Sequence, residues 1–311
     1  MSSPESVSSR RNEHYTYPES PSWQSKILTA GLQVSGYKKR INSLTRENIS
    51  KQSVPPPKTL ERTGRLTKLD ENTSLLIPEC SSERESHVFY LHGGAYAWGM
   101  TKFHWRFVEK LSDEAKANVV IPDYPLAPKA TYREVFDTIL PRYKNLANSV
   151  GNDNLTIMGD SAGGGMALAL AQKLRDENYP QPKNIVLVSP WLDVGLKNKR
   201  ISDIADRDPM LGIDVLRLAG SLYADGDIEN PLASPGRRSI QNLARLSLYF
   251  AGRDILAPDA LALRERMMKE DIPGDSYYYP ETLHAWPLFT WLPEAKFALQ
   301  SMASTIKLPR I

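Results

Sequence analysis

Ser161 lies within a glycine-rich run, residues 159–165, that reads Gly-Asp-Ser-Ala-Gly-Gly-Gly. An apolar run over 154–158 precedes it, and residues 166–175 are mostly strong helix formers, so the expected order is strand, tight turn, serine, helix. This order is typical of a nucleophile elbow, whose turn is too sharp for a Cβ atom on either side of the serine. The elbow would lift the Ser161 hydroxyl above the sheet edge and aim the Ala162 amide at the same point, which favours nucleophilic attack on a carbonyl carbon.

A nucleophilic serine needs a base within reach and a carboxylate that orients the base. Of the five histidines, His284 follows the last expected strand and lies near the C-terminus. Asp254 comes shortly after the strand-like run 246–251, where its carboxylate would project into the loops that also hold Ser161. The chain order serine, acid, histidine is the order of α/β-hydrolases. Asp259 is the competing acid, although capping the helix that begins there is its more ordinary role.

The developing oxyanion needs backbone amide donors, and the chain offers a second glycine turn for them. Residues 92–95 read His-Gly-Gly-Ala directly after an apolar strand-like run. Glycines let the backbone turn its amides toward the nucleophile without obstruction by side chains. We therefore predict an oxyanion hole formed by Gly93, Gly94 and Ala95 together with Ala162, in which each donor contributes about 3 kcal/mol to the transition state. A structural turn between strand and loop is the alternative interpretation of these glycines.

Aromatic residues beside these loops are candidates for lining a substrate pocket. Tyr96 and Trp98 follow the oxyanion turn, and Trp286 lies beside His284. Trp191 follows a buried strand and is a weaker candidate. Packing in the core accounts for each of the four equally well, and better for Trp191.

Strand-like and helix-like segments alternate beyond residue 58, which predicts a mostly parallel central sheet with helices on both faces, the α/β class. The first two strands would form a leading antiparallel pair. The expected strands are 65–69, 74–77, 87–91, 118–122, 154–158, 184–188, 246–251 and 276–279. The expected helices are 103–115, 132–147, 166–175, 213–223 and 261–269.

Three regions divide the chain. Residues 1–22 are polar, contain proline and show no periodicity, which predicts a flexible tail. Residues 23–57 carry apolar positions at helical spacing with basic residues on the other face, and they end in three prolines. We expect this segment to be a helical cap over the active site, in preference to a membrane-surface helix. The catalytic domain then spans 58–311, with a second cap element inserted at about 193–240, where no clear strand pattern occurs.

Composition excludes several classes of protein. The net charge is +3 and the basic residues are scattered, which argues against a nucleic-acid partner. Cys80 is the single cysteine, so an intrachain disulfide and a thiolate zinc site are both excluded. The first 11 residues lack the apolar core of a signal peptide, and no run approaches a membrane span. We therefore expect a soluble, cytoplasmic protein with no stable insertion into membranes.

Several motifs follow one another between about residue 85 and the C-terminus. They are His92-Gly93-Gly94, Tyr124-Pro125-Leu126-Ala127-Pro128, Gly159-Asp160-Ser161-Ala162-Gly163-Gly164, Ser189-Pro190-Trp191-Leu192-Asp193 and Ala233-Ser234-Pro235, followed by Asp254 and His284. Together they resemble the hormone-sensitive lipase family of α/β-hydrolases, the bacterial family IV esterases and their fungal relatives.

This resemblance implies a carboxylic-ester hydrolase that works through an acyl-enzyme intermediate. Ser161 would be the nucleophile, His284 the base and Asp254 its orienter, while His92 would hold the oxyanion loop. The resemblance also implies no cofactor and no metal, a helical cap, a small-molecule ester as substrate and often a homodimer. A lactone hydrolase would use the same machinery. A ligand-binding receptor on the same fold is a further alternative, which the presence of both His284 and Asp254 disfavours.

Three departures from the family pattern concern substrate choice more than reaction class. Ala95 stands where most relatives have a further glycine, although its backbone amide still donates. Tyr124-Pro125 replaces the usual tyrosine and arginine, so a salt-bridging group is lost. The sequence after Asp254, residues 255–259, follows the family pattern loosely.

Overall fold

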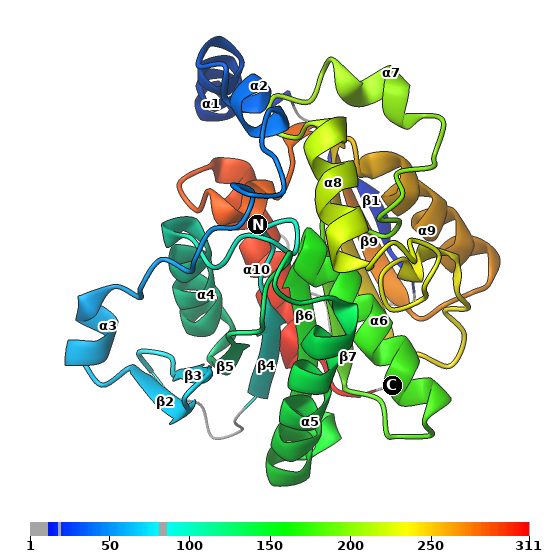
Figure 1. The fold of residues 1–311 in the computed structure, drawn as a ribbon. Helices are drawn as coiled ribbons and strands as arrows, with labels where there is room; N and C mark the ends of the chain where they lie inside the picture. The colour runs from blue at the N-terminus through cyan, green and yellow to red at the C-terminus, as the bar shows by residue number, and fades with distance from the viewer. Residues whose placement is uncertain (1–11, 18–19, 81–85, 311) are drawn as a thin grey trace, which may run out of the picture.

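A computed structural model describes residues 12–17, 20–80 and 86–310 of the protein. In these residues one nine-stranded sheet runs through the molecule with helices on both faces (Figure 1), which confirms the predicted α/β class. The strand order is β1-β9-β8-β7-β6-β4-β5-β3-β2. All neighbours pair in parallel except β3, which is antiparallel to both β2 and β5, so the expected leading antiparallel pair is present.

The strands are β1 His14–Thr16, β2 Leu66–Asp70, β3 Thr73–Leu76, β4 Ser86–Leu91, β5 Ala117–Pro122, β6 Leu155–Asp160, β7 Asn184–Val188, β8 Arg245–Arg253 and β9 Gly274–Leu283. The helices are α1 Trp23–Val34, α2 Tyr37–Asn42, α3 Lys58–Arg62, α4 Lys102–Ala115, α5 Tyr132–Val150, α6 Ala162–Asp176, α7 Ile201–Ala205, α8 Ile213–Tyr223, α9 Ala257–Lys269 and α10 Pro293–Lys307. Short 3₁₀ turns are η1 Asn152–Asn154, η2 Pro235–Arg237 and η3 Trp286–Leu288. None of the helices in the described part of the chain is long and apolar enough to cross a membrane.

Two apolar cores lie on opposite faces of the sheet, because side chains alternate between the faces of a strand. Along β4, Phe89 and Leu91 join the core that contains α5 and α6, whereas Val88 and Tyr90 join the core that contains α4 and α10. Figure 1 shows α5 and α6 in front of the sheet and α10 behind it. Both faces of the central strands are therefore covered, which leaves the loops at the strand ends as the place for chemistry.

The predicted flexible tail over residues 1–22 is wrong where the structure describes it. His14–Thr16 forms an edge strand parallel to β9, and residues 1–11 and 18–19 lie outside the described part. The strand is held by aromatic packing, since the Tyr17 ring stacks on Tyr279 with centroids 4.7 Å apart. A strand of three residues is too short to show a periodic pattern. The polar composition of the surrounding segment therefore predicted a tail and not a strand.

The N-terminal helices and the insertion after β7 contact each other. Lys38 of α2 donates to the backbone oxygens of Ala205 and Asp208, the latter at 3.0 Å. Asn42 accepts a hydrogen bond from the Val215 amide of α8 at 3.0 Å. The two segments predicted to form the cap thus form one assembly, at the upper end of the molecule in Figure 1.

Candidate active site

The nucleophile elbow predicted at Ser161 is formed between β6 and α6. Ser161 has φ 54° and ψ −121°, a backbone conformation that costs free energy for a residue other than glycine and often occurs at functional sites. The conformation is held from both sides, because the Ser161 amide donates to Val188 at 2.8 Å and its carbonyl accepts from the Trp191 amide at 2.9 Å. The neighbouring strand β7 and the loop after it therefore fix the strained turn.

The glycines on either side of the elbow are required by close backbone approaches. A Cβ atom on Gly159 would lie 2.2 Å from the Gly163 oxygen, and one on Gly163 would lie 1.9 Å from the Leu91 oxygen. Real Cβ atoms do not come so close to backbone, so both positions exclude any larger residue. The structure thus explains the glycine spacing from which the elbow was predicted.

His284 and Asp254 are brought together by the register of β8 and β9. The last pair in this parallel ladder is Arg253 of β8 with Leu283 of β9. Asp254 and His284 are the residues that follow these two, so they leave the sheet side by side. His284 Nδ1 lies 2.8 Å from Asp254 Oδ2, and both side chains are buried. The Leu256 amide donates to the other Asp254 oxygen at 2.9 Å, which fixes the orientation of the carboxylate. The geometry is that of a histidine base with its orienting acid.

The pKa of His284 is raised from its ordinary value. Burial acts to lower it, but the negative charge of Asp254 and the hydrogen bond to it outweigh burial, with smaller contributions from Asp208 and Asp160. The imidazolium form is therefore stabilised, as a base that accepts a proton from serine requires.

Ser161 follows β6, and His284 and Asp254 follow β9 and β8, so all three residues lie at the same edge of the parallel sheet. Within the described ranges the Ser161 hydroxyl makes no hydrogen bond to His284. Catalytic hydrogen bonds are often long or poorly aligned before a substrate binds, so this separation does not argue against a triad. Residues Ser161 and His284 are only 8% and 5% exposed, which limits direct access of bulk water.

The predicted oxyanion loop lies directly against the elbow. A Cβ atom on Gly93 would lie 2.9 Å from the Ser161 Cβ atom, so only glycine fits there. The Gly93 amide, however, donates to Asp160 Oδ1 at 3.0 Å, and this bond corrects the prediction that it serves the oxyanion. Gly94 and Ala95 remain as donor candidates in the loop, and Ala95 takes the left-handed conformation with φ 53°.

Asp160, the residue before Ser161, holds this loop through its carboxylate. Its carboxylate accepts hydrogen bonds from Gly93 and from the Tyr90 hydroxyl, and His104 Nε2 lies 3.4 Å from it. Burial acts to raise the pKa of Asp160, but the His104 charge and the hydrogen bonds more than compensate, so its pKa is lowered. An ionised Asp160 therefore fixes the oxyanion loop relative to Ser161.

His92 supports the same loop and does not act as a base. Its Nδ1 lies 2.7 Å from the Gly93 carbonyl oxygen, and its ring stacks on Tyr124 with centroids 4.3 Å apart. Complete burial, with a smaller contribution from His104, lowers the pKa of His92 to about 4. A neutral ring whose Nδ1–H donates to Gly93 is the state that this environment stabilises, which agrees with the structural role implied by the family resemblance.

The three aromatic residues predicted to line a substrate pocket lie in different surroundings. Tyr96 stacks on Tyr223 of α8 with centroids 3.7 Å apart, and it also packs against Trp191. Trp98 donates through Nε1 to the Ile49 oxygen, so it holds the N-terminal segment. Trp286 is fully buried in the core beside α10. Tyr96 is thus the candidate placed between the oxyanion loop and the cap, whereas Trp98 and Trp286 are packing residues.

Asp208 is a buried carboxylate at this site that the sequence analysis did not identify. It comes from the cap insertion, and its Oδ2 accepts a hydrogen bond from the Ile255 amide at 2.9 Å, directly after Asp254. Its Oδ1 accepts from the Met210 and Leu211 amides at 2.7 and 2.9 Å. Burial and the charge of Asp254 raise the pKa of Asp208 to about 6. The insertion after β7 therefore places a second carboxylate beside the His284–Asp254 pair, and no spacing in the sequence signals it.

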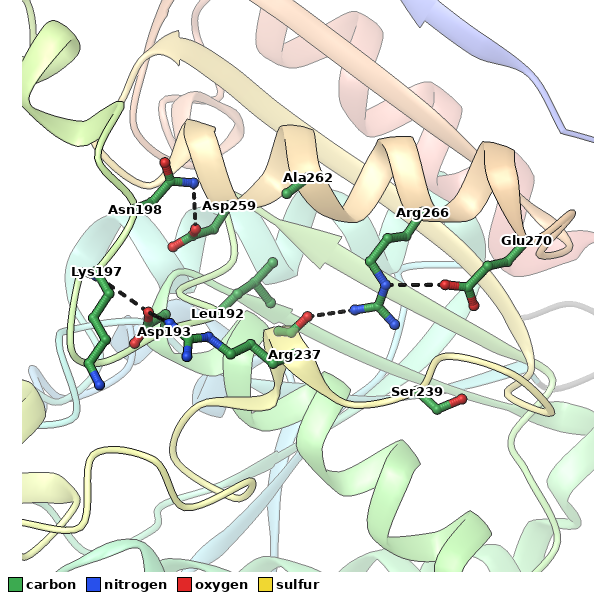
Figure 2. A pocket seen from close by; sticks show the side chains of 11 residues that line it. Leu192, Asp193, Lys197, Asn198, Arg237, Ser239, Asp259, Ala262, Arg266 and Glu270 are labelled. Carbon is green, nitrogen blue, oxygen red and sulfur yellow. Dashed lines mark hydrogen bonds and ion pairs between the residues drawn. The ribbon is translucent and has the colours of Figure 1, made fainter.

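Asp259, the competing acid, lies elsewhere. It accepts a hydrogen bond from Asn198 at 2.9 Å and lines a cavity of about 610 Å³ between α9 and the start of the insertion (Figure 2). The helix start at Leu256 has no side-chain cap, so Asp259 is neither the orienter of His284 nor a cap. None of the predicted catalytic residues lines this cavity.

The sequence of the catalytic region matches a family described as "alpha/beta hydrolase fold" over residues 88–288. The chain belongs to this family. Among its relatives, an esterase of Acinetobacter venetianus is 30% identical over 220 residues, which are 70% of this chain and 73% of that protein. An acetyl-hydrolase of Streptomyces hygroscopicus is 31% identical over 216 residues, covering 68% of this chain and 72% of that protein.

Solved structures of the α/β-hydrolase family have the same architecture. A Staphylococcus aureus protein assigned as an esterase has a TM-score of 0.77 at 27% identity, with 89% of this chain and 93% of that chain covered. A hormone-sensitive lipase from a metagenome library has a TM-score of 0.76 at 24% identity, covering 92% and 99%, and shares the fold. The family match together with the esterase and acetyl-hydrolase relatives supports the expected ester-hydrolysing enzyme, and the hormone-sensitive lipase structure shows the shared fold.

Proposed function

We propose that the protein is a serine carboxylesterase for small acyl esters, with a triad of Ser161, His284 and Asp254. The observation that carries the proposal is the buried His284–Asp254 pair, 2.8 Å apart, at the strand ends beside a strained serine elbow. A structural histidine would not need an orienting carboxylate whose second oxygen is itself fixed by a backbone amide.

In the proposed reaction His284 Nε2 takes the Ser161 proton as the serine oxygen attacks the ester carbonyl carbon. The amides of Gly94, Ala95 and Ala162 stabilise the oxyanion of the tetrahedral intermediate. Asp254 stabilises the imidazolium, which then protonates the leaving alcohol and leaves an acyl group on Ser161. His284 next activates a water molecule, whose attack releases the acid and restores the serine.

The cap supports the choice of small acyl groups. The stacked rings of Tyr96 and Tyr223 stand between the oxyanion loop and α8, and both are buried in the core. We expect these fixed aromatic rings to limit the length of the acyl chain that fits beside the oxyanion loop. This arrangement favours acetyl to butyryl groups over long chains.

A series of p-nitrophenyl esters from acetate to octanoate tests the substrate class, with simple lactones assayed beside it. We expect kcat/KM to be highest for acetate or butyrate and to fall for longer chains, and every activity to disappear in Ser161→Ala. A lactone kcat/KM above that of all the esters would make the enzyme a lactone hydrolase with the same triad. Failure to hydrolyse any ester or lactone in a serine-dependent way would overturn the proposal.

The pH dependence of kcat/KM reports on His284. Protonated His284 cannot accept the serine proton, so activity is present above the pKa of His284 and is lost as the pH falls through it. Since that pKa is raised, we expect the acid limb to have its midpoint above the ordinary histidine value of about 6.5.

Asp208→Asn tests the second carboxylate by the same profile. Removal of its negative charge, one of the charges that raise the pKa of His284, should move the acid limb to lower pH. Asp206→Asn, an exposed carboxylate two residues earlier, is the matched control and should leave the limb in place. If Asp208→Asn lowers the maximum kcat/KM without moving the midpoint of the acid limb, the role of Asp208 is only to hold the loop after Asp254.

A further inference from the structure

Helix α1 has two apolar faces, and only one of them packs against the protein. Leu28 and Leu32 pack onto the core that contains α10. Trp23, Ile27 and Val34 lie on the opposite side at spacings of four and seven residues, and their exposed fractions are 68%, 62% and 88%. The three form a continuous stripe along the helix, since such spacings place side chains on one face. Isolated exposed apolar residues are ordinary on protein surfaces, but a stripe along one helix is not.

The charged residues of the segment that carries this stripe have one sign. Residues 21–45 contain four basic residues and no acidic residue, although the chain as a whole has 39 basic and 36 acidic residues. Lys38 donates to the cap insertion, while Lys26, Lys39 and Arg40 are exposed. An exposed apolar stripe that starts with tryptophan and is flanked by basic side chains is the composition of a helix that lies in a membrane interface.

Helix α1 is also joined by hydrogen bonds to helix α10, the next helix after His284. The amide and the hydroxyl of Ser22, the N-cap of α1, donate to the two carboxylate oxygens of Glu294 at 2.6 and 3.0 Å. Glu294 lies in the first turn of α10, a short distance after the 3₁₀ turn η3 that follows His284.

We infer that the outer face of α1, with Trp23, Ile27 and Val34 as its apolar stripe, docks the enzyme onto an anionic lipid surface. The apolar side chains enter the boundary between headgroups and acyl chains, and Lys26, Lys39 and Arg40 contact the lipid phosphates and carboxylates. The helix lies on the membrane, because 12 residues rise only about 18 Å and a bilayer core is about 30 Å thick.

Charge favours a lipid surface over a second copy of the chain. In a two-fold symmetric dimer the same patch meets itself, so the basic residues around the stripe would face one another. Like charges placed opposite each other disfavour such an interface. An anionic surface instead complements the exposed basic residues of this segment, Lys26, Lys39 and Arg40.

Co-sedimentation of the full chain with vesicles tests this inference. We expect binding to vesicles of phosphatidylcholine with phosphatidylserine, and at least tenfold weaker binding to phosphatidylcholine alone. Each basic residue near an anionic surface contributes about fivefold in affinity, so Lys26→Glu/Lys39→Glu should weaken binding by more than tenfold and high salt should act in the same direction. Trp23→Ser/Ile27→Ser/Val34→Ser should weaken binding by at least about tenfold.

The matched control replaces three exposed apolar residues outside α1, as Leu69→Ser/Ile77→Ser/Met268→Ser, and should bind vesicles as the natural sequence does. Thermal unfolding of each variant confirms that the fold is intact. Vesicle binding is measured without ester hydrolysis. A negative result would therefore refute the docking surface without bearing on the proposed reaction. Equal binding by the α1 variants and the natural sequence, or no vesicle binding at all, would overturn the inference. A dimer in solution that only the α1 variants dissociate would assign the stripe to a second copy.

Discussion

Replacement of Ser161 by alanine should reduce kcat for p-nitrophenyl acetate by roughly 10⁶-fold, as removal of the nucleophile does in serine hydrolases. The side chain lost is a single hydroxyl, and the strained backbone at this position is fixed by hydrogen bonds from β7 and the loop after it. Alanine keeps those bonds, so the fold should persist. A stopped assay for released p-nitrophenol, sensitive enough to detect the residual rate, provides the measurement.

Ser247→Ala is the matched control for this loss. Ser247 is fully buried on β8, away from the predicted site, and its hydroxyl has no hydrogen-bond partner among the described residues. Its replacement removes the same atom from an equally buried position and should leave kcat within about twofold, since this hydroxyl touches neither nucleophile nor base. Comparable losses in both variants would mean that Ser161 contributes to folding and not to chemistry.

The second large effect is expected from His284. His284→Ala should reduce kcat about as far as Ser161→Ala, because a serine without its base is no longer activated. The double variant Ser161→Ala/His284→Ala should then be little worse than either single variant, since residues that act as a unit give non-additive losses. Steady-state kinetics on the three variants measures this coupling.

His14→Ala provides the histidine control. His14 lies on the edge strand β1, where its ring contacts Ser276, so its loss should leave kcat close to that of the natural sequence. An additive double variant, or a mild effect of His284→Ala, would show that another group removes the serine proton.

The central part of the fold could be predicted because its signals are local. The buried strands of the sheet are short apolar runs, and Gly159 is required by a contact only four residues away, with Gly163. Asp254 and His284 were predictable for a related reason, since each follows the end of a strand. Parallel pairing of those two strands then brings the residues together without any further information.

Elements defined by distant contacts could not be predicted in this way. Strand β1 has three residues and gains its stability from tyrosine rings of β9, about 260 positions later. Helix α10 was not predicted either, although it forms much of the second core. Asp208 is missed for the same reason, because a carboxylate within an irregular insertion carries no pattern until the chain folds it against the Ile255 amide.

For the oxyanion loop, the sequence predicts the position of the backbone but not the partner of each amide. The glycines of the oxyanion turn indicated correctly that backbone approaches the nucleophile there, but the sequence does not say which amides face it. The Gly93 amide donates to Asp160, so Gly94 and Ala95 are the remaining donor candidates in this loop. The motif predicts the loop, and its hydrogen bonds decide the role of each residue.

The most direct test of the account is covalent labelling with a p-nitrophenyl phosphonate ester, which reacts with an activated serine and remains attached. We predict one label per chain by intact mass, its location on Ser161 by peptide mapping, loss of activity in proportion to labelling, and no reaction with Ser161→Ala. Loss of activity with the label on another residue, or full activity in a chain labelled at Ser161, would contradict the assignment of Ser161 as the nucleophile.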